Sequence, residues 1–551
     1  MLQPTTLIDQ VLRYRCTNDL NDWKKFITDP DERKTIFSEY AEQVPVHPSV
    51  IFYESMSGAR MMDSPYSIFN SLITEYREQF QNNLHVWSVR STDVIPDAAR
   101  KIPNVIFIKR HTKEYLYYLA RSKYVISNST LPEYFVRRSE QKYLNTWHGI
   151  GYKTLGRTQA SPLGAGLAVT NMMQSTHSIS PCEFMTSIHL NGFSMAGNYS
   201  GQLAETGYPR IDTTLNITRA RQMQIRREMG LKLDRKTVLY APTWRGDSNA
   251  EPFDIDRLEL DLKQMSDLGL NVIFMGHHIM MNQISSANFS DVIIPQSNSN
   301  TNELLSIVDI MITDYSSIFF DFLVTGKPII HYLYDYDEYK QSRGLALEID
   351  ELPGFIAFTS EELRSRVSAL NEHDYEETYK YKECRKKYCT YDEGDSTRKV
   401  VEWFFFDEKS NIKIVDPSSG KQTMIFWGGR LDDSKERENF LTKISEAAAS
   451  EIYTVSVLFA RNVLQYDDVA DTLRKLGDQI SVIARGGYAF GMTRAEISAR
   501  SNKDTPEASA LYDNIYRREY RRMFGDQRFD EVVTFKNLSF FWRELAKYSY
   551  K

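Results

Sequence analysis

Short apolar runs alternate with longer amphipathic stretches along most of the chain. The runs are rich in Val and Ile, four to seven residues long and bounded by turn residues, which is typical of strands buried on both faces of a parallel sheet. Between them lie helical patterns such as 257–269, which ends at a glycine. This alternation predicts an α/β protein with doubly wound sheets. The predicted strands are 50–55, 105–110, 124–128, 237–244, 271–278, 292–295, 307–317 and 327–333.

The pattern divides the chain into two large α/β units and a smaller third one. We expect a helical, polar lead-in over 1–46 and Rossmann-like domains over 47–215 and 216–412. An additional α/β domain is expected over 420–551, where the strand pattern resumes after a turn-rich stretch. The length supports several units, because 551 residues are too many for one core at ~100–200 residues per domain.

Composition narrows the function classes. Hydrophobic residues make up 42% and charged residues 25% of the chain, and the net charge is −6. There is no overall attraction for nucleic acid or an anionic membrane, so an anion site must be local. The four cysteines form no CxxC pair, so we expect thiols, as in the cytoplasm. No apolar run approaches the ~20 residues of a membrane helix, and the first residues do not look like a signal peptide.

The strongest local signal is TDYSSIFFDF, residues 313–322. A buried strand is predicted to end there, and Asp314 or a neighbouring serine can cap the helix that follows. Ser316 and Ser317 would then place hydroxyls and free backbone N–H groups at a helix N-terminus, an arrangement that attracts phosphate. A plain helix cap is the commoner role of such a pattern and stays open as the alternative.

Three of the ten histidines stand at predicted strand ends. His148 follows the run YLNTW and precedes Gly149, while His277 and His278 end the strand NVIFMG. Side chains at the carboxyl ends of parallel strands line the ligand crevice of open α/β folds. A structural role is more frequent for any single histidine. Two α/β units that face each other would nevertheless bring all three to one cleft.

Arg245, in the segment APTWRGD, also follows a predicted strand end. A guanidinium in that position can clamp a phosphate with two hydrogen bonds, and a surface ion pair is the alternative. Arg210 and Asp212 lie in a Gly-Pro turn between the first two domains, where we expect a connector. The sequence has no Walker loop, no GxGxxG after the first strand, no HExxH, no zinc spacing and no GxSxG.

Eight segments in this order resemble the CDP-glycerol glycerophosphotransferase family, which includes the teichoic acid polymerases and capsule-polymer relatives. The resemblance covers roughly residues 45–400 and implies a GT-B arrangement of two domains, with the donor held in the C-terminal half. The matching segments are 50–55, 124–135, 145–156, 207–212, 240–247, 276–278, 309–332 and 336–344.

On this resemblance, His148 accepts the proton of the acceptor hydroxyl, since its ordinary pKa suits a general base. Gly149 and Lys153 are implied to lie on the acceptor side. The segment after His148 reads GIGYK, where Thr-Pro-Leu-Lys is common in the family, so the acceptor contacts are expected to differ.

The resemblance also implies a donor site. His277 is the second implied catalytic residue, stabilising charge as CMP leaves. The family usually has a basic residue before this histidine and a proline after it, whereas this chain reads Met-Gly-His-His, so His278 is the alternative. The residues implied to hold or orient the donor pyrophosphate are Arg245, Asp314, Ser316, Ser317 and His278.

The implied reaction moves glycerol phosphate, or another phosphopolyol, from CDP-glycerol or CDP-ribitol to a hydroxyl of a growing teichoic-acid-like or capsular polymer. The expected acceptor is a polyol phosphate or glycan, lipid-linked, at the inner face of the cell membrane. No cofactor is implied, although a divalent cation such as Mg²⁺ and an oligomer stay open, and no nucleic acid is expected. A ribitolphosphotransferase, a non-catalytic polymer-binding scaffold and a nucleotide-sugar glycosyltransferase are the alternatives.

Residues 420–551 resemble the N-terminal half of a glycosyltransferase domain often fused to this family. The stretch lacks the Gly/Asn/Ser-rich turn expected after WGG, and the sequence ends before a second half. We therefore expect this unit to be non-catalytic, or the chain to be a piece of something larger. The basic, aromatic stretch 515–524 is expected to be a solvated helix face, with contact to an anionic polymer or membrane surface as the alternative.

Overall fold

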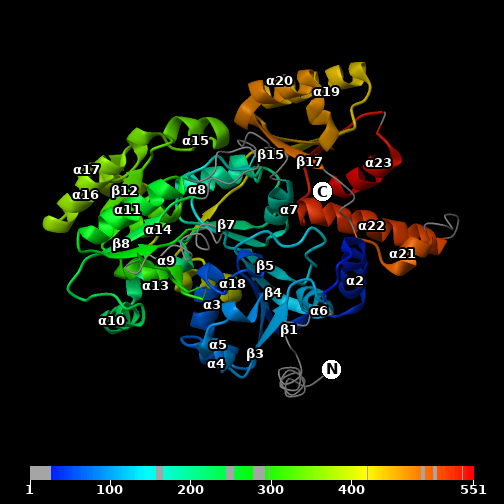
Figure 1. Cartoon of the computed structure of the whole chain (residues 1–551). Helices are drawn as coiled ribbons and strands as arrows, with labels where there is room; N and C mark the ends of the chain where they lie inside the picture. Colours follow the sequence, from blue (N-terminus) through cyan, green and yellow to red (C-terminus); the bar gives the residue numbers. More distant parts are fainter. Residues whose placement is uncertain are drawn as a thin grey trace.

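Three mainly parallel sheets, each covered by helices, build the molecule (Figure 1). A computed structural model describes most of the chain. The described residues are 26–156, 166–243, 254–276, 292–296, 298–418, 420–485, 491–499, 506–536 and 538–551. The predicted α/β class is confirmed, and the domain boundaries stay a prediction.

The first sheet has eight strands in the order β14-β7-β6-β5-β4-β1-β2-β3, and all pairs except β14–β7 are parallel. Neighbouring residues of β1 enter different cores, Phe52 on one face of the sheet and Tyr53 on the other. This explains the continuous apolar run in the sequence. The strands are β1 (His47–Glu54), β2 (Leu84–Val89), β3 (Val105–Lys109), β4 (Ser122–Ser127), β5 (Lys142–Asn145), β6 (His177–Ser180), β7 (Gln202–Glu205) and β14 (Lys413–Val415).

Helices cover both faces of this sheet. Helix α3 (Asp63–Ile73) packs on one face, and α6 (Lys113–Arg121) and α2 (Pro30–Gln43) pack on the other. Helix α2 begins at the cap Asp29, whose carboxylate accepts from the N–H of Asp31, with Pro30 in its first turn.

The second sheet has six parallel strands in the order β10-β9-β8-β11-β12-β13. Helices α11 (Ile255–Asp267) and α16 (Ser360–Glu372) cover one face, and α13 (Thr301–Ile307) and α14 (Ile318–Leu323) cover the other. The strands are β8 (Thr237–Ala241), β9 (Asn271–Phe274), β10 (Val292–Ile293), β11 (Ile310–Thr313), β12 (Ile329–Tyr332) and β13 (Phe355–Ala357).

The chain crosses between these two sheets twice, at adjacent points. It enters the second half after α9 (Pro209–Asn216) and returns through α18 (Ser396–Phe406). Asn216 Nδ2 donates to the carbonyl of Gly394 at 2.6 Å, so the outgoing and returning segments touch. Helix α18 then packs on the first half, where the Phe405 ring lies 4.7 Å from that of Tyr124, and β14 extends the first sheet.

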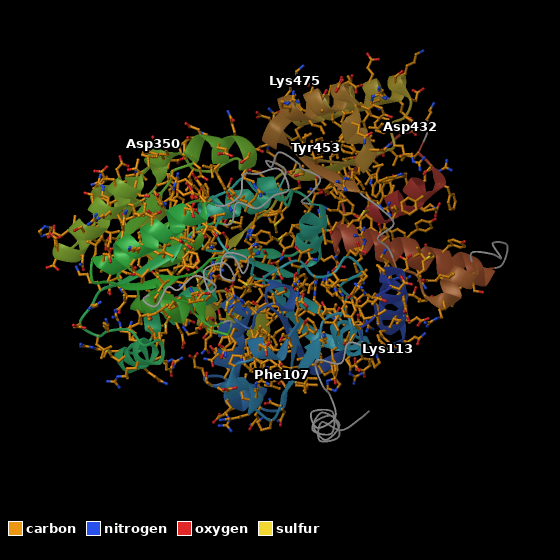
Figure 2. The ribbon with its side chains drawn as sticks, in the orientation of Figure 1. Phe107, Lys113, Asp350, Asp432, Tyr453 and Lys475 are labelled. Carbon is orange, nitrogen blue, oxygen red and sulfur yellow. The ribbon has the colours of Figure 1, made fainter. Side chains whose placement is uncertain are left out.

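The third sheet has four parallel strands in the order β17-β16-β15-β18. Helices α19 (Ser434–Ala449) and α20 (Asp467–Leu476) cover one face, and α22 (Pro506–Phe524) and α23 (Phe540–Ala546) cover the other. Charged side chains such as Lys475 point outward from this unit (Figure 2). The strands are β15 (Gln422–Gly429), β16 (Tyr453–Ala460), β17 (Ile480–Arg485) and β18 (Glu531–Thr534).

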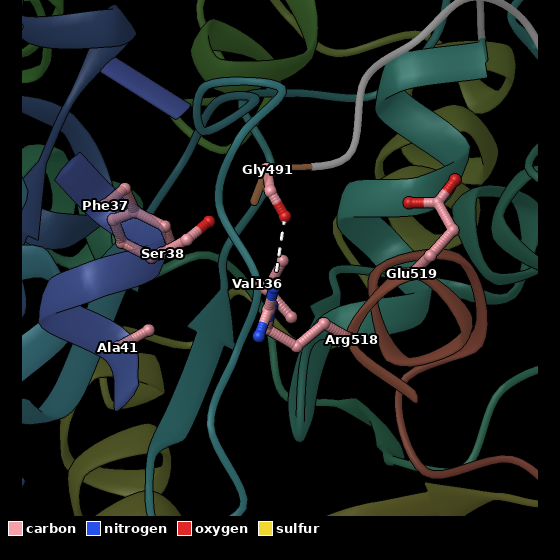
Figure 3. A pocket seen from close by; sticks show the side chains of 7 residues that line it. All are labelled: Phe37, Ser38, Ala41, Val136, Gly491, Arg518 and Glu519. Atoms are coloured by element: carbon pink, nitrogen blue, oxygen red, sulfur yellow. Dashed lines mark hydrogen bonds between the residues drawn. The ribbon is translucent and has the colours of Figure 1, made fainter. Parts of the chain in front are cut away.

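The third unit rests on the first through α22, beside α7 (Gly166–Gln174) and α2 (Figure 1). Arg518 of α22 pairs with Glu42 of α2 at 2.8 Å and donates to the carbonyl of Gly491 at 3.2 Å, beside a small pocket at this junction (Figure 3). The residues that line the pocket are Phe37, Ser38, Ala41, Val136, Gly491, Arg518 and Glu519.

Helix α22 corrects the expectation of a solvated face over 515–524. Tyr516 and Tyr520 are buried, and Glu519 is buried between Arg522, at 2.7 Å, and Arg485 of β17, at 2.8 Å. The arginines of this stretch therefore serve the inside of the molecule as well as its surface. Among the described helices, none combines the length and the apolar character that a bilayer crossing would require.

Candidate active site

The strand order of the second sheet brings three predicted motifs to one edge. Strands β9, β8 and β11 are neighbours, and parallel strands present their carboxyl ends on the same edge of a sheet. The chain that follows β11 carries the serine motif. The chains that follow β9 and β8 carry His277, His278 and Arg245, which lie outside the described residues.

Asp314 ties two of these strand ends together. Its carboxylate is buried, with 2% of the residue exposed, and accepts the N–H of Thr243 at 2.9 and 3.0 Å. It also accepts the N–H of Tyr315 at 2.5 Å. The side chain therefore joins the end of β8 to the end of β11, and it is not the cap of α14, which is Ser317.

Ser316 and Ser317 form the turn between β11 and α14, and both are partly exposed. Ser317 occupies the cap position but its hydroxyl makes no capping hydrogen bond. Helix α14 has six residues, so its dipole is weak and anion binding here would depend on hydroxyls and N–H groups. The helix cap, the alternative from sequence, is therefore not the role of the Ser317 hydroxyl in this structure.

His148 lies just beyond β5, on the carboxyl edge of the first sheet. Its Nδ1 is 2.9 Å from the carbonyl oxygen of Asn128. A carbonyl only accepts, so Nδ1 carries the proton and Nε2 keeps a free lone pair when the ring is neutral. Trp147, with a left-handed φ of 52°, turns the chain at this point, and its ring lies 4.1 Å from the imidazole.

The electrostatic setting keeps the ring neutral. His148 has an exposed edge, while the surrounding protein removes enough hydration to lower its pKa below the ordinary 6.5. The Asn128 carbonyl and the nearby Asp63 oppose this shift, and the positive charge of Arg210 adds to it. At neutral pH the Nε2 lone pair is therefore available to accept a proton.

Gly149 brings the two halves into contact. A methyl group on its α-carbon would lie 3.5 Å from Ser317 Oγ and 3.3 Å from Arg210 Nη2, and its φ is 143°. A side chain here would strain the backbone and press on both neighbours. The loop that carries His148 thus lies directly against the serine turn of the second half.

A buried ionic triad sits beside this contact. Arg210 of α9, 5% exposed, donates to both oxygens of Asp321 of α14 at 2.7 Å. Its other nitrogen bonds Asp63, at the start of α3, at 3.2 Å. Asp63 has a left-handed φ of 69°, a strained conformation that tends to occur at functional sites. The carboxylates hold the pKa of Arg210 well above its usual range despite burial.

Sequence reasoning missed this triad. Two of its members stood in segments already singled out, GYPRID and TDYSSIFFDF, yet no spacing rule indicates that residues 63, 210 and 321 meet. The separation of Asp63 from Arg210 is 147 positions and that of Arg210 from Asp321 is 111.

Lys153 lies against the second half of the molecule. It forms an isolated antiparallel bridge with Leu345, and its Nζ is 5.5 Å from the centre of the Tyr339 ring. The N–H of Ala346 donates to the carbonyl of Tyr152 at 2.8 Å. The segment after His148 therefore crosses the cleft. Its predicted acceptor-side role is untested.

Metal ligation was left open by the sequence. In the part of the chain that the structure describes, no three His, Cys, Asp or Glu side chains converge as a metal site would require.

Comparison with known proteins identifies relatives over the first two domains. The sequence model of the family CDP-Glycerol:Poly(glycerophosphate) glycerophosphotransferase matches residues 36–405. A teichoic acid poly(glycerol phosphate) polymerase of Bacillus spizizenii is 29% identical over 377 residues, covering 65% of this chain and 92% of that protein. A polymerase of the same description from Staphylococcus epidermidis is 27% identical over 399 residues, covering 69% of this chain but 53% of that protein.

Ribitol enzymes and solved structures also match. A teichoic acid poly(ribitol-phosphate) polymerase of Bacillus spizizenii is 27% identical over 317 residues, covering 54% of this chain and 47% of that protein. The structure of the wall teichoic acid polymerase TagF superposes with a TM-score of 0.60 at 23% identity, covering 73% of this chain and 97% of that one. Another TagF structure was soaked with CDPG. The TagF likeness confirms the predicted two-domain GT-B fold, and the family match shows that this chain belongs to the CDP-glycerol:poly(glycerophosphate) glycerophosphotransferase family.

Proposed function

We propose that the chain transfers glycerol phosphate, or another phosphopolyol, from a CDP-activated donor to a hydroxyl at the end of a polyol-phosphate polymer, releasing CMP. One observation carries the proposal. In a member of this family, the loop with His148 lies directly against the Ser317 turn, so that a candidate base and a candidate phosphate-binding turn face one another.

His148 acts as the general base in the proposed reaction. Its Nε2 takes the proton of the acceptor hydroxyl as that oxygen attacks the phosphorus next to the polyol. The bond from that phosphorus to the CMP oxygen breaks, CMP leaves with the electron pair, and a phosphodiester remains. The Asn128 carbonyl fixes the tautomer that leaves Nε2 unprotonated. Most of the acceleration comes from positioning and charge stabilisation, as in other phosphoryl transfers.

The donor pyrophosphate binds at the serine turn. The Ser316 and Ser317 hydroxyls face it, and Asp314 holds the turn by joining β8 to β11. On the family resemblance we extend the donor site to Arg245, His277 and His278, which follow the neighbouring strand ends. Gly149 permits the close approach of the two halves, while Lys153 contributes to the contact across the cleft.

Replacing His148 tests the base. Transfer from CDP-glycerol to a synthetic glycerol-phosphate acceptor should fall by about 10²–10⁴-fold in His148→Ala, measured as acceptor-dependent CMP release. His177→Ala is the matched control, because that ring is buried far along the sheet order against Trp403 and the site should stay intact if the variant folds. Full activity in His148→Ala would remove the base assignment.

The polyol and the setting belong to the same proposal. Both glycerol- and ribitol-phosphate polymerases are relatives, so we propose a CDP-polyol donor and test it by mass spectrometry of products from CDP-glycerol and CDP-ribitol. We place the protein in the cytoplasm, at the inner membrane face, where a lipid-linked acceptor would be presented. A scaffold without activity is the competing proposal, and failure to bind millimolar CDP would favour it.

A further inference from the structure

A strained loop lies next to the His148 loop on the carboxyl edge of the first sheet. It follows β1, and three consecutive residues have left-handed φ values: Met56 at 48°, Ser57 at 53° and Gly58 at 80°. Such conformations are uncommon outside glycine and concentrate at binding and catalytic sites. The Met56 side chain is 41% exposed on this edge.

Hydrogen bonds connect this loop to His148 on one side. The carbonyl of Asn128 accepts from the imidazole at 2.9 Å, and the Asn128 side-chain oxygen accepts the N–H of Met56 at 2.8 Å. Ser129 Oγ accepts the N–H of Ser57 at 2.8 Å. The segment after β4 therefore fixes the imidazole and the strained loop together.

Arg90 holds the loop on its other side. It follows β2, its Nε donates to the carbonyl of Ser57 at 2.9 Å, and its N–H donates to the carbonyl of Gly58 at 2.7 Å. The side chain is exposed, so the remaining guanidinium nitrogens face solvent. His148, the segment after β4, the strained loop and Arg90 form one continuous row along the edge.

The Arg90 end of this row is positively charged. Arg33, Arg90 and Arg110 surround His111, whose pKa is lowered to about 3 by burial and by these three charges. Glu54 pairs with Arg110 at 3.3 Å. Across the described parts of the chain, neither Arg33 nor Arg90 has a carboxylate partner within ion-pair distance, so two positive charges remain uncompensated.

The row has a defined length. His148 follows β5 and Arg90 follows β2, and the sheet order places β4 and β1 between them. Three strand spacings of about 4.8 Å separate the two positions by about 14 Å. A polyol-phosphate chain whose terminal hydroxyl lies at His148 would need more than one repeat to reach Arg90.

We propose that Arg90, assisted by Arg33, is an anion subsite that holds a phosphodiester group of the acceptor polymer behind the hydroxyl attacked at His148. The inference rests on the proposed function and adds the path of the acceptor. A guanidinium suits a phosphodiester because its fork offers two parallel hydrogen bonds. The subsite selects acceptors that already carry several phosphates.

Binding of acceptor chains tests the subsite without catalysis. The probe is a fluorescent glycerol-phosphate oligomer with several phosphodiesters, compared with a single-phosphate acceptor, by anisotropy at several salt concentrations. Arg90→Gln should weaken the oligomer about 3–10-fold, flatten its salt dependence and reduce the preference for long over short acceptors. Arg474→Gln is the control, an exposed arginine in the third unit that pairs with Asp471, and it should match the wild type.

Arg90→Lys separates charge from loop support. It keeps the positive charge but loses the planar fork, so it should retain most of the oligomer affinity. Equal loss in Arg90→Lys and Arg90→Gln, equal loss for both acceptor lengths, or no loss at all would overturn the subsite. Anionic phosphatidylglycerol vesicles form a second arm, and an Arg90 effect confined to vesicles would also overturn it.

The same experiment separates this inference from the proposed function. If the wild type shows no CMP release but its oligomer affinity depends on Arg90, the transferase proposal fails and the subsite stands. If CMP release occurs and oligomer affinity ignores Arg90, the subsite fails alone.

Discussion

At the scale of single residues, His148 shows how a base is prepared by its surroundings. The surrounding protein lowers its pKa, while the Asp63 carboxylate raises it. A lowered pKa extends the range of the unprotonated form toward acid, so the acid limb of kcat/KM should lie below the ordinary 6.5. Asp63→Asn removes a charge that stabilises the imidazolium, and the limb should move to still lower pH.

The pH profile of kcat/KM for both proteins checks this. Since Asp63 also pairs with Arg210, Asp63→Asn is expected to lower the rate as well. Position of the limb, unlike its height, reports on the imidazole. A limb that stays in place, or moves to higher pH, would contradict the electrostatic assignment.

At the scale of elements, the Arg210 triad joins α9, α3 and α14 beside the cleft. Removing the guanidinium leaves two buried carboxylates without their partner, so Arg210→Ala should lower the free energy of unfolding by about 3–5 kcal/mol. Arg210→Lys keeps a charge but not the two-pronged bond to Asp321, and should lower kcat by loosening the contact of Gly149 with Ser317.

Urea unfolding and CMP release measure the two effects. The matched control is Arg221→Ala in helix α10 (Arg219–Glu228), whose partly exposed pair with Glu303 at 2.8 Å should contribute less than about 1 kcal/mol. An Arg210→Ala protein as stable as this control would show that the triad does not hold the halves together.

The elements also explain which parts of the structure were predictable. Parallel strands were predicted because burial on both faces leaves an apolar run, as in β1. The return of α18 to the first half was not, because an amphipathic helix does not reveal which sheet it covers. Four arginines suggested a solvated α22, yet Glu519 compensates Arg485 and Arg522 inside the fold, a long-range pairing that local sequence cannot show.

The same division applies to the candidate site. The strand-end rule and the family resemblance placed His148, Asp314 and the serines near one cleft, since both depend on local sequence. The Asp63–Arg210–Asp321 triad and the row to Arg90 depend on strand order, which no local pattern encodes. The outcome for His277, His278 and Arg245 lies outside the described residues.

At the scale of the whole molecule, buried neutral histidines make stability depend on pH. Burial lowers the pKa of His85, His177 and His189 to about 3. The unfolded chain takes up their protons near pH 6.5, whereas the folded chain does so only near pH 3. Stability therefore falls as pH drops through this window, by up to about 1.4 kcal/mol per pH unit for each histidine.

One buried carboxyl opposes this loss. Burial raises the pKa of Asp392 to about 7, so the folded chain gains its proton before the unfolded chain does. The net slope should be about 3 kcal/mol per pH unit between pH 6 and 4, measured by urea unfolding at each pH. His189→Phe should reduce it by about 1.4, because neither ring nitrogen of His189 has a hydrogen-bond partner among the described residues.

The two chain crossings have a mechanical consequence. Asn216 and Gly394 touch, and Asp212 accepts the N–H groups of Ser396 and Thr397 where α18 begins. Crossings this close act as one swivel, which fixes where the halves meet but not the angle between them. The angle is set at the other end of the lever, by Arg210 and by the strap from Tyr152 to Ala346. Substitutions far from the donor can therefore change how wide the enzyme opens between turnovers.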